Sequence, residues 1–314
     1  MGSETTPELL ILDFNNPGMK PGSNCWTSAS KNIREAFENH GFFVALYDKI
    51  SPQLHKSIFK ATQDLLDLPL QTKIQNINEK PYHGYMGQIP IAPLHEALGI
   101  DYADTLEGAQ SFTTLMWPQG NQSFCETTMS FAKTVAELEK KVTTMLFESY
   151  GLEKHADPHR DATTYLLRLM KYGVPNEGQT TLGLPPHTDK SFISILYQNH
   201  ISGLQTMARD GKWINVQFPP TSFVVMAGDA CKAWSNDRVL SAIHKVTMDS
   251  KGKETRYTAG LFSFLTKTVE VPKELVDDEH PLKFKPFAHV DWLKFYETDQ
   301  GLRSQNLLQD FCGV

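Results

Sequence analysis

Cysteine is scarce in this chain, and the few cysteines are not paired along the sequence. Cys25, Cys125, Cys231 and Cys312 lie far apart, and no CxxC pair occurs. Disulfide scaffolds and thiolate zinc sites need closely spaced cysteines, so the sequence argues against both. We therefore expect the protein in a reducing compartment, the cytoplasm.

Long blocks of charge and long apolar runs are also missing. The 30 Lys and Arg residues against 36 Asp and Glu residues give a formal net charge of -6, and neither sign gathers into a block. A nucleic-acid surface needs clustered basic residues, and a membrane span needs about 18 apolar residues in a row. Residues 1–14 hold no basic region followed by an apolar run, so no leader is predicted. We expect a monomer that binds a small molecule, with no nucleic acid and no membrane as partner.

The first half of the chain has mainly helical patterns. It begins with a predicted short strand at 9–13, a helix that Ser28 precedes and that runs to Phe37, and a strand at 42–46. Apolar residues then recur at helical spacing over about 52–67, which predicts a second helix. The longest helix is predicted over about 124–150 and ends at Gly151. Neither a repeat nor a low-complexity linker interrupts the sequence, so 1–314 is predicted to be a single domain with an N-terminal helical part at about 1–150.

The pattern changes near residue 163 to short apolar or alternating runs separated by Gly, Pro, Asn and Asp. These runs are 163–172, 191–197, 213–218, 222–227, 242–248 and 256–265. Their even spacing favours an antiparallel sandwich or barrel. The fold class is therefore mainly β with flanking helices, the core lies at about 160–268, and a last helix is predicted near 290–298.

A metal-binding pattern begins at His187. Iron(II) that activates dioxygen needs ligands on one face only, and two imidazoles with one carboxylate provide this. In His187-Thr-Asp189, residues two apart on a strand project from the same side. The His-x-Asp pattern also occurs at His155/Asp157, His159/Asp161 and His289/Asp291.

Context selects one of these copies. Only His187 introduces a strand-like run and is followed by a long β-rich segment, which places His244 in another predicted strand. Residues 155–161 read as a turn-rich link because they contain Pro158. The alternative is that His187 and His244 are unrelated, hydrogen-bonded strand residues.

Arg256 and Thr258 suit a co-substrate beside the metal. A dicarboxylate needs a planar, permanently charged donor, and arginine offers two parallel hydrogen bonds. Thr258 adds a hydroxyl on the same strand face. A turn at 249–252 would fold this strand back from His244 and bring Arg256 into the same cavity. The alternative for a strand arginine is a surface ion pair.

Taken together, these residues resemble the plant-type 2-oxoglutarate- and iron(II)-dependent dioxygenases, which are built on a double-stranded β-helix, or jelly roll. The similarity extends over nearly the whole chain and is most like the glucosinolate side-chain subgroup. The segments that carry it include Gly41-Phe-Phe43, Leu68-Pro69-Leu70, Trp117-Pro118, His187-Thr-Asp189, Gly203-Leu-Gln205, Gly228-Asp229, His244-Lys-Val246 and Arg256-Tyr-Thr258.

The resemblance implies iron ligands and 2-oxoglutarate contacts. The ligands would be His187, Asp189 and His244, with no catalytic residue beyond the metal centre, and Arg256 and Thr258 would contact 2-oxoglutarate. Thr258 stands where the family usually has serine. The usual Asn-Tyr-Tyr-Pro stretch reads as residues 170–175 here, so only Tyr172 is carried over as a co-substrate contact.

The activity implied is oxidation of a plant specialised metabolite, most simply its hydroxylation, with release of succinate and CO2. Dioxygen is consumed and ascorbate is the expected reductant. Following the family pattern, Tyr85, Phe112, Phe262 and Phe264, with the loop around 90–106, would bind the substrate; ordinary core packing is the alternative for each. Three other functions stay open: a hormone-inactivating dioxygenase, an iron oxidase independent of 2-oxoglutarate, and a non-catalytic ligand-binding protein.

Overall fold

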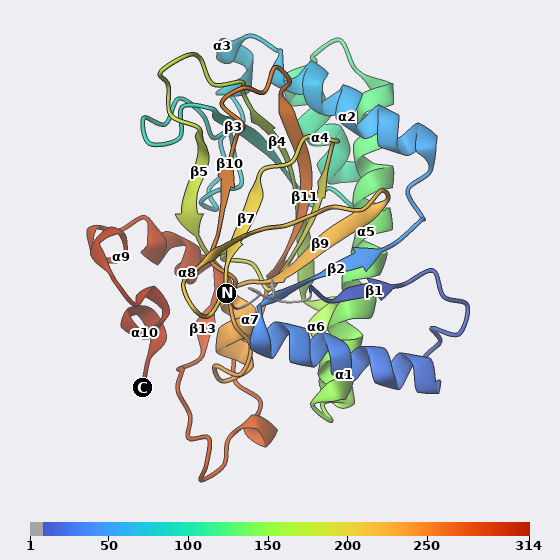
Figure 1. Cartoon of the computed structure of the whole chain (residues 1–314), viewed down its shortest axis with the longest axis vertical. Coiled ribbons are helices and arrows are strands. Elements are labelled where there is room, and N and C mark those ends of the chain that lie inside the picture. The colour runs from blue at the N-terminus through green and yellow to red at the C-terminus, as the bar shows by residue number, and fades with distance from the viewer. Residues whose placement is uncertain (1–8) are drawn as a thin grey trace, which may run out of the picture.

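Two β-sheets face each other and form the centre of the molecule in a computed structural model that describes residues 9–314 (Figure 1). Residues 1–8, part of the stretch in which no leader was predicted, lie outside the described residues. The larger sheet has the order β1-β2-β9-β6-β11-β4-β3 and the smaller one β5-β10-β7-β8. The strands are β1 (Ile11–Asp13), β2 (Phe42–Leu46), β3 (His95–Asp101), β4 (Thr163–Tyr172), β5 (Leu182–His187), β6 (Ile193–Gln198), β7 (Leu204–Met207), β8 (Trp213–Asn215), β9 (Ser222–Ala227), β10 (His244–Thr247), β11 (Arg256–Leu265), β12 (Thr268–Val269) and β13 (Phe287–Ala288).

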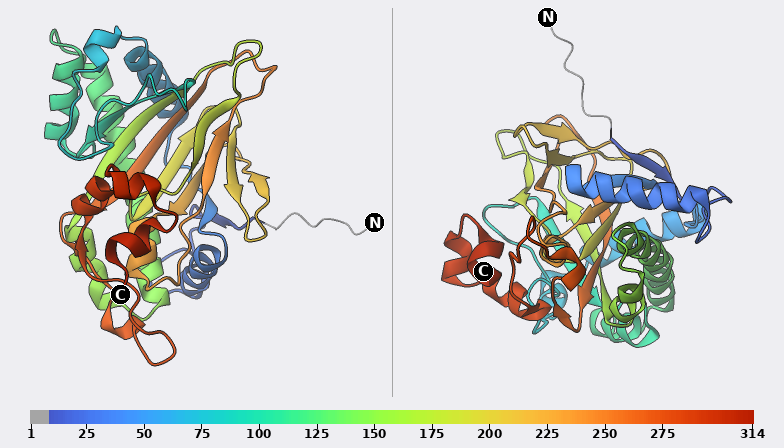
Figure 2. Two further views of the ribbon diagram at one scale, coloured as in Figure 1. Left: turned by 90° about the vertical axis from the view of Figure 1, so that its left-hand side faces the viewer. Right: turned by 90° about the horizontal axis from the view of Figure 1, so that it is seen from below.

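Helices cover the outer face of the larger sheet, as the views in Figure 2 show. The long helix α5 packs against α1, α2 and α4, and together with the sheet they bury the main apolar core. The helices are α1 (Asn24–Asn39), α2 (Pro52–Leu66), α3 (Leu70–Lys73), α4 (Leu106–Met116), α5 (Gln122–Ser149), α6 (Glu153–Asp161), α7 (Asp229–Trp234), α8 (His289–Tyr296), α9 (Asp299–Arg303) and α10 (Leu307–Cys312), with a 3-10 turn at Lys273–Leu275. Within residues 9–314, every helix is too short or too polar to span a bilayer.

Side-chain caps explain where the predicted helices begin. Ser51 accepts a hydrogen bond from the Leu54 amide, and Pro52 occupies the first helical position, where its missing N–H costs nothing. Asn121 caps the long helix α5 in the same way. The prediction that Ser28 precedes the first helix was wrong, because Ser23 accepts from the Trp26 amide and starts α1 at Asn24.

Two further predictions about local structure were wrong. The segment around Pro158 is the short helix α6 rather than a turn-rich link; the proline removes one hydrogen bond from a helix of 9 residues that ends soon after it. Strands β10 and β11, predicted to fold back on each other through the turn at 249–252, belong to different sheets. The chain therefore crosses from one sheet to the opposite one at this point.

Strands β4 and β11 position much of the interior because they pair in antiparallel register along all 10 residues of each. Directly opposed residues project to the same side of a sheet, and alternate residues project to opposite sides. Leu167 and Leu169 therefore face the helices with Leu261, and they belong to the main core. Arg168 and Arg256 are on the other face, toward the smaller sheet.

Candidate metal and co-substrate site

The two histidines of the predicted metal site come from neighbouring strands of the smaller sheet. His244, the first residue of β10, pairs directly with His187, the last residue of β5, and the ring centroids lie 4.2 Å apart. The Nδ1 of His187 is 2.8 Å from the Pro185 carbonyl, and that of His244 is 3.0 Å from the Ala242 carbonyl. A carbonyl only accepts, so each Nδ1–H donates and each Nε2 presents its lone pair to the shared space.

Asp189 completes the cluster from a loop and not from the strand. Strand β5 ends at His187, so the expectation of both motif residues on one strand was wrong. The Asp189 Oδ1 lies 3.8 Å from the His187 Nε2 and 3.7 Å from the His244 Nε2. Its Oδ2 is buried without a hydrogen-bond partner. Among residues 9–314 these three residues are the one group whose metal-ligating atoms converge, all within 4.8 Å of one another.

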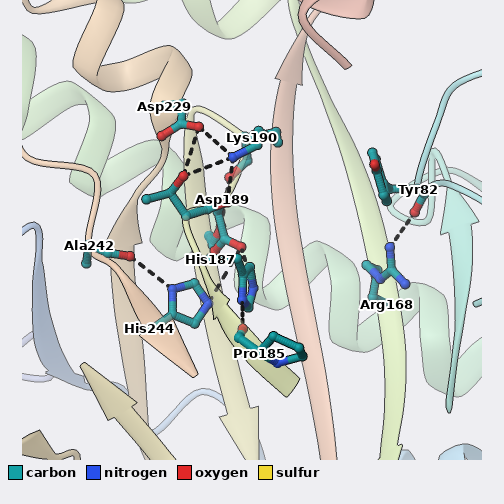
Figure 3. A network of polar contacts seen from close by, with 12 residues as sticks. Tyr82, Arg168, Pro185, His187, Asp189, Lys190, Asp229, Ala242 and His244 are labelled. Atoms are coloured by element: carbon teal, nitrogen blue, oxygen red, sulfur yellow. Dashed lines mark hydrogen bonds and ion pairs between the residues drawn. The ribbon is translucent and has the colours of Figure 1, made fainter. Parts of the chain in front are cut away.

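A network of polar contacts holds the loop that carries Asp189 (Figure 3). The Asp229 carboxylate accepts from the Lys190 Nζ at 2.7 Å and from the Thr188 hydroxyl at 3.0 Å. The Asp229 amide donates to the Asp189 carbonyl at 2.8 Å. Three residues in a row are thereby tied to the start of α7, which fixes the direction of the Asp189 side chain.

Burial keeps the imidazole of His187 neutral. Desolvation, and next the neighbouring His244, lower the pKa of His187 to about 4. Burial alone would raise the pKa of Asp189, but His244 and His187, with smaller contributions from Ser194 and Lys190, together hold it below its ordinary value. A neutral imidazole and an ionised carboxylate are the forms that bind a divalent metal.

Arg256 lies in the larger sheet and is only 1% exposed. Its Nη2 and Nε donate to the Gln198 Oε1 at 2.8 and 3.3 Å, and its guanidinium carbon lies 4.9 Å from the centroid of the Tyr172 ring. Its Nη1 has no partner, and neither has the buried hydroxyl of Thr258 two residues along the same strand face. Arg256 therefore does not form the surface ion pair that was the alternative.

These orphaned polar atoms fit the two groups that the sequence implies. A buried donor or acceptor without a partner costs about 1–3 kcal/mol, so several in one place indicate a missing ligand. Two imidazoles and a carboxylate are a set for ferrous iron that leaves coordination positions open. A free guanidinium nitrogen with a nearby hydroxyl suits the carboxylate of a keto-diacid.

A cavity of about 270 Å³ opens beside the cluster of His187, Asp189 and His244, and the first two of these residues line it. Two predicted substrate residues, Phe262 and Phe264, line it. Residues 89, 91, 92 and 95 also line it, and three of them belong to the predicted loop at 90–106. The loop itself is partly regular, because it contains β3.

The other two predicted substrate residues lie elsewhere. The Tyr85 hydroxyl donates to Glu96 at 2.9 Å, and the ring packs against the main core. Phe112 is buried in α4 and stacks on Phe124 with 5.9 Å between centroids. Neither Tyr85 nor Phe112 lines the cavity beside His187 and Asp189.

Sequence reasoning missed several residues of the site. Asp229 stood in a recognised Gly-Asp segment, which was a usable signal for its role in holding the loop. Gln198 had no signal, because only the pairing of β6 with β11 brings it to Arg256. Arg168, which lines the cavity, was read as part of an ordinary strand.

Comparisons with known proteins agree with this geometry. Residues 144–264 match the family described as 2OG-Fe(II) oxygenase superfamily, and residues 11–115 match the family described as non-haem dioxygenase in morphine synthesis N-terminal. The probable 2-oxoglutarate-dependent dioxygenase AOP1.2 of Arabidopsis thaliana is 42% identical over 314 residues, covering 97% of this chain and 96% of that protein.

Solved structures are similar over most of their length. The dioxygenase for auxin oxidation from rice has a TM-score of 0.80 and 25% identity, covering 98% of this chain and 100% of that chain. The dioxygenase for auxin oxidation 1 from Arabidopsis thaliana, solved with 2-oxoglutarate, has a TM-score of 0.77 and 26% identity, covering 87% of this chain and 99% of that chain.

Proposed function

The chain belongs to the 2OG-Fe(II) oxygenase superfamily and is a 2-oxoglutarate-dependent dioxygenase, and from this premise we propose that His187, Asp189 and His244 bind the ferrous ion. The predicted family, the jelly roll and the cofactor pair of iron and 2-oxoglutarate are confirmed. The observation that carries the residue assignment is the convergence of three ligating side chains within 4.8 Å.

Arg256 and Thr258 then bind 2-oxoglutarate, with Tyr172 forming a wall of this part of the site. Gln198 keeps the guanidinium in place through two hydrogen bonds to Nε and Nη2, which leaves Nη1 for the carboxylate. Thr258 offers its hydroxyl to the same group, replacing the serine that is usual in the family. Both side chains come from one strand, so the site for the co-substrate is rigid before it binds.

Iron with 2-oxoglutarate supplies the activation of dioxygen, and decarboxylation of the keto acid to succinate and CO2 supplies two electrons. The protein's own residues position and shelter the reactants. The hydrogen bonds to Pro185 and Ala242 fix both imidazoles, and the Asp229 network fixes the carboxylate. The apolar cavity orients a C–H bond of the substrate beside the metal and excludes water, with Phe262 and Phe264 as its aromatic walls.

The substrate in this proposal is a plant specialised metabolite, and the outcome is its hydroxylation. Similarity to the AOP1.2 protein over nearly the whole chain supports this class. Hormone inactivation is a second candidate, favoured by the likeness to two dioxygenases for auxin oxidation. A panel of plant metabolites that includes auxin, analysed by mass spectrometry for gain of one oxygen, distinguishes the two.

The residue assignment is tested by succinate release with iron(II), ascorbate and 2-oxoglutarate. We expect His187→Ala to abolish release with any substrate and to remove high-affinity iron binding, measured by metal analysis after dialysis. His155→Ala, which changes another His-x-Asp copy, serves as the control and should keep both. Full succinate release by the His187→Ala variant would contradict the assignment.

We also propose that the chain acts as a monomeric single domain in the cytoplasm. Strands from the N-terminal part pair within the larger sheet, which supports one domain. The four widely spaced cysteines support a reducing compartment. Light scattering during gel filtration and imaging of a fluorescent fusion in plant cells test these points.

A further inference from the structure

Arg168 is a second buried arginine in the barrel interior, only 8% exposed and part of the cavity lining. Its Nη1 donates to the Tyr82 carbonyl, and its Nη2 lies 3.0 Å from the Met86 sulfur. Neither partner carries a charge, and no ion pair of residues 9–314 includes Arg168 (Figure 3). Burial lowers its pKa to about 10, so the guanidinium stays cationic at neutral pH.

The other charged groups of the cavity are already balanced. Lys190 is paired with Asp229 at 2.7 Å, and burial lowers the pKa of His95 to about 3, which leaves that ring neutral. Asp189 is the one carboxylate whose charge acts on Arg168, but a bound ferrous ion would neutralise that charge. In the loaded enzyme the positive charges of the ferrous ion and Arg256 are balanced in full by the negative charges of Asp189 and the 2-oxoglutarate dianion. The positive charge of Arg168 therefore has no counterpart in the loaded enzyme.

Arg168 is held at a fixed place relative to the co-substrate. It lies directly opposite Gly260 on β11, four positions along from Arg256 on the same strand face. With a rise of about 3.3 Å per strand residue, the two arginines start about 13 Å apart along the strands. Phe262 and Phe264, beyond Gly260 on that face, line the cavity together with Arg168.

The surrounding fold positions the guanidinium. On its other side Arg168 pairs with Gly99 of β3, where a Cβ would lie only 2.2 Å from the His83 carbonyl oxygen. The missing side chain lets the segment around Tyr82 and His83 pass close to the sheet. That close approach brings the Tyr82 carbonyl to the Arg168 guanidinium.

The remaining walls of the cavity are mainly apolar. They include Met86, Ile91, Leu184, Pro186, Phe264 and Leu293. A buried charge is retained in such surroundings only when a counter-charge binds it. We propose that Arg168 recognises an anionic headgroup, a carboxylate or a sulfate, of a substrate whose apolar body lies along these walls. This rests on the proposed function, because it takes the cavity as the substrate site.

The test compares acids with their neutral counterparts in the loaded protein. With Mn(II) in place of iron and saturating 2-oxoglutarate, phenylacetate, phenylpropanoate, phenylbutanoate and the sulfate ester of phenylethanol are titrated by calorimetry, each against its primary amide or parent alcohol. We expect at least one anion to bind about tenfold or more tightly than its neutral counterpart, because charge-assisted hydrogen bonds are lost in the latter. The two anion types show which headgroup is preferred.

Variants separate recognition from a structural role. Arg168→Met should bring the ratio of anion to neutral affinity to about one, whereas Arg168→Lys, which keeps the charge, should retain a preference. Arg34→Met is the matched control, since Arg34 does not line the cavity and is part of a half-buried ion pair with Glu38. If Arg168→Met fails to fold, the ratio of anion to neutral affinity in the wild type and in Arg168→Lys still tests the proposal.

Three outcomes overturn the proposal. These are equal or absent binding of anions and neutral counterparts by the wild type, an anion preference that survives in Arg168→Met, and anions that bind only by displacing 2-oxoglutarate. Binding of 2-oxoglutarate itself is measured in every variant. Its loss in the wild type would count against the proposed function, whereas intact 2-oxoglutarate binding without anion preference counts only against the role of Arg168.

Discussion

Two positions on the β4–β11 strand pair, one at its end and one near its middle, offer a direct comparison. At one end Arg256 is fixed by the Gln198 side chain and faces Tyr172. Near the middle of the pair, opposite Gly260, Arg168 is held by a backbone carbonyl and a thioether sulfur, beside an apolar cavity. One pair of strands thus presents two buried cations, one in polar and one in mainly apolar surroundings.

The difference indicates how one fold can keep its co-substrate and change its substrate. The region around Arg256 is proposed to bind 2-oxoglutarate, which is the same in every turnover, and its donors belong to regular strands. The region around Arg168 depends on the segment around Tyr82 and on α8, which supplies Leu293 and Tyr296 to the cavity. Loops and terminal helices vary more readily than paired strands, so the region proposed to bind the substrate is free to change.

The largest effect is expected when the two arginines are exchanged for methionine one at a time. Arg256→Met removes charge-assisted hydrogen bonds that are worth about 1.5–3 kcal/mol each, so the KM for 2-oxoglutarate should rise about 100-fold or more. Arg168→Met should change that KM less than about threefold, because it does not contact the co-substrate. Steady-state succinate release measures both. Equal effects of the two variants on the KM would break the comparison between the two arginines.

A smaller effect is expected from the glycine beside Arg168. In Gly99→Ala the new Cβ would meet the His83 backbone, so the free energy of unfolding should fall by about 1–3 kcal/mol as in other overpacked positions. Displacement of this segment should also weaken the anion preference, with 2-oxoglutarate binding nearly unchanged. Urea unfolding and the calorimetric titration provide the two measurements.

Gly173, which directly follows β4 at the Arg256 end of the strand pair, offers the matched control. A Cβ there would meet only the Leu94 carbonyl, at 3.8 Å, so Gly173→Ala should cost little stability. If Gly99→Ala proves as stable as the wild type, the close approach of the Tyr82 segment does not depend on that glycine.

The smallest effect is expected at Thr258. Removal of its hydroxyl in Thr258→Val should raise the KM for 2-oxoglutarate about 2- to 10-fold, which corresponds to one neutral hydrogen bond of about 0.5–1.5 kcal/mol. Thr258→Ser, which restores the residue usual in the family, should bind 2-oxoglutarate as well as the wild type does. An unchanged KM in Thr258→Val would show that the hydroxyl is not a ligand and leave Arg256 alone at this end.

Much of the fold was predictable because local patterns agreed with the tertiary structure. The apolar spacing of α2 and α5 and the short apolar or alternating runs of β4, β9 and β11 predicted these elements within a few residues. Strand β3, with sequence HEALGID, was not predicted, since Ala, Gly and Glu have low strand propensity and pairing with distant segments, β4 and Met86, stabilises it. Strand β5 contains Pro185 and Pro186, which are tolerated because it lies at a sheet edge.

By itself the sequence determined the chemistry of the centre: two imidazoles, one carboxylate and an arginine, in an order along the chain that suits iron and a keto-diacid. Tertiary structure decided which residues surround that centre. It placed Asp189 on a loop tied to Asp229, put Gln198 beside Arg256, and brought Arg168 into the cavity while leaving Tyr85 and Phe112 outside. The physical reason is strand register, because pairing between distant segments sets which side chains share a face, and no local pattern encodes that pairing.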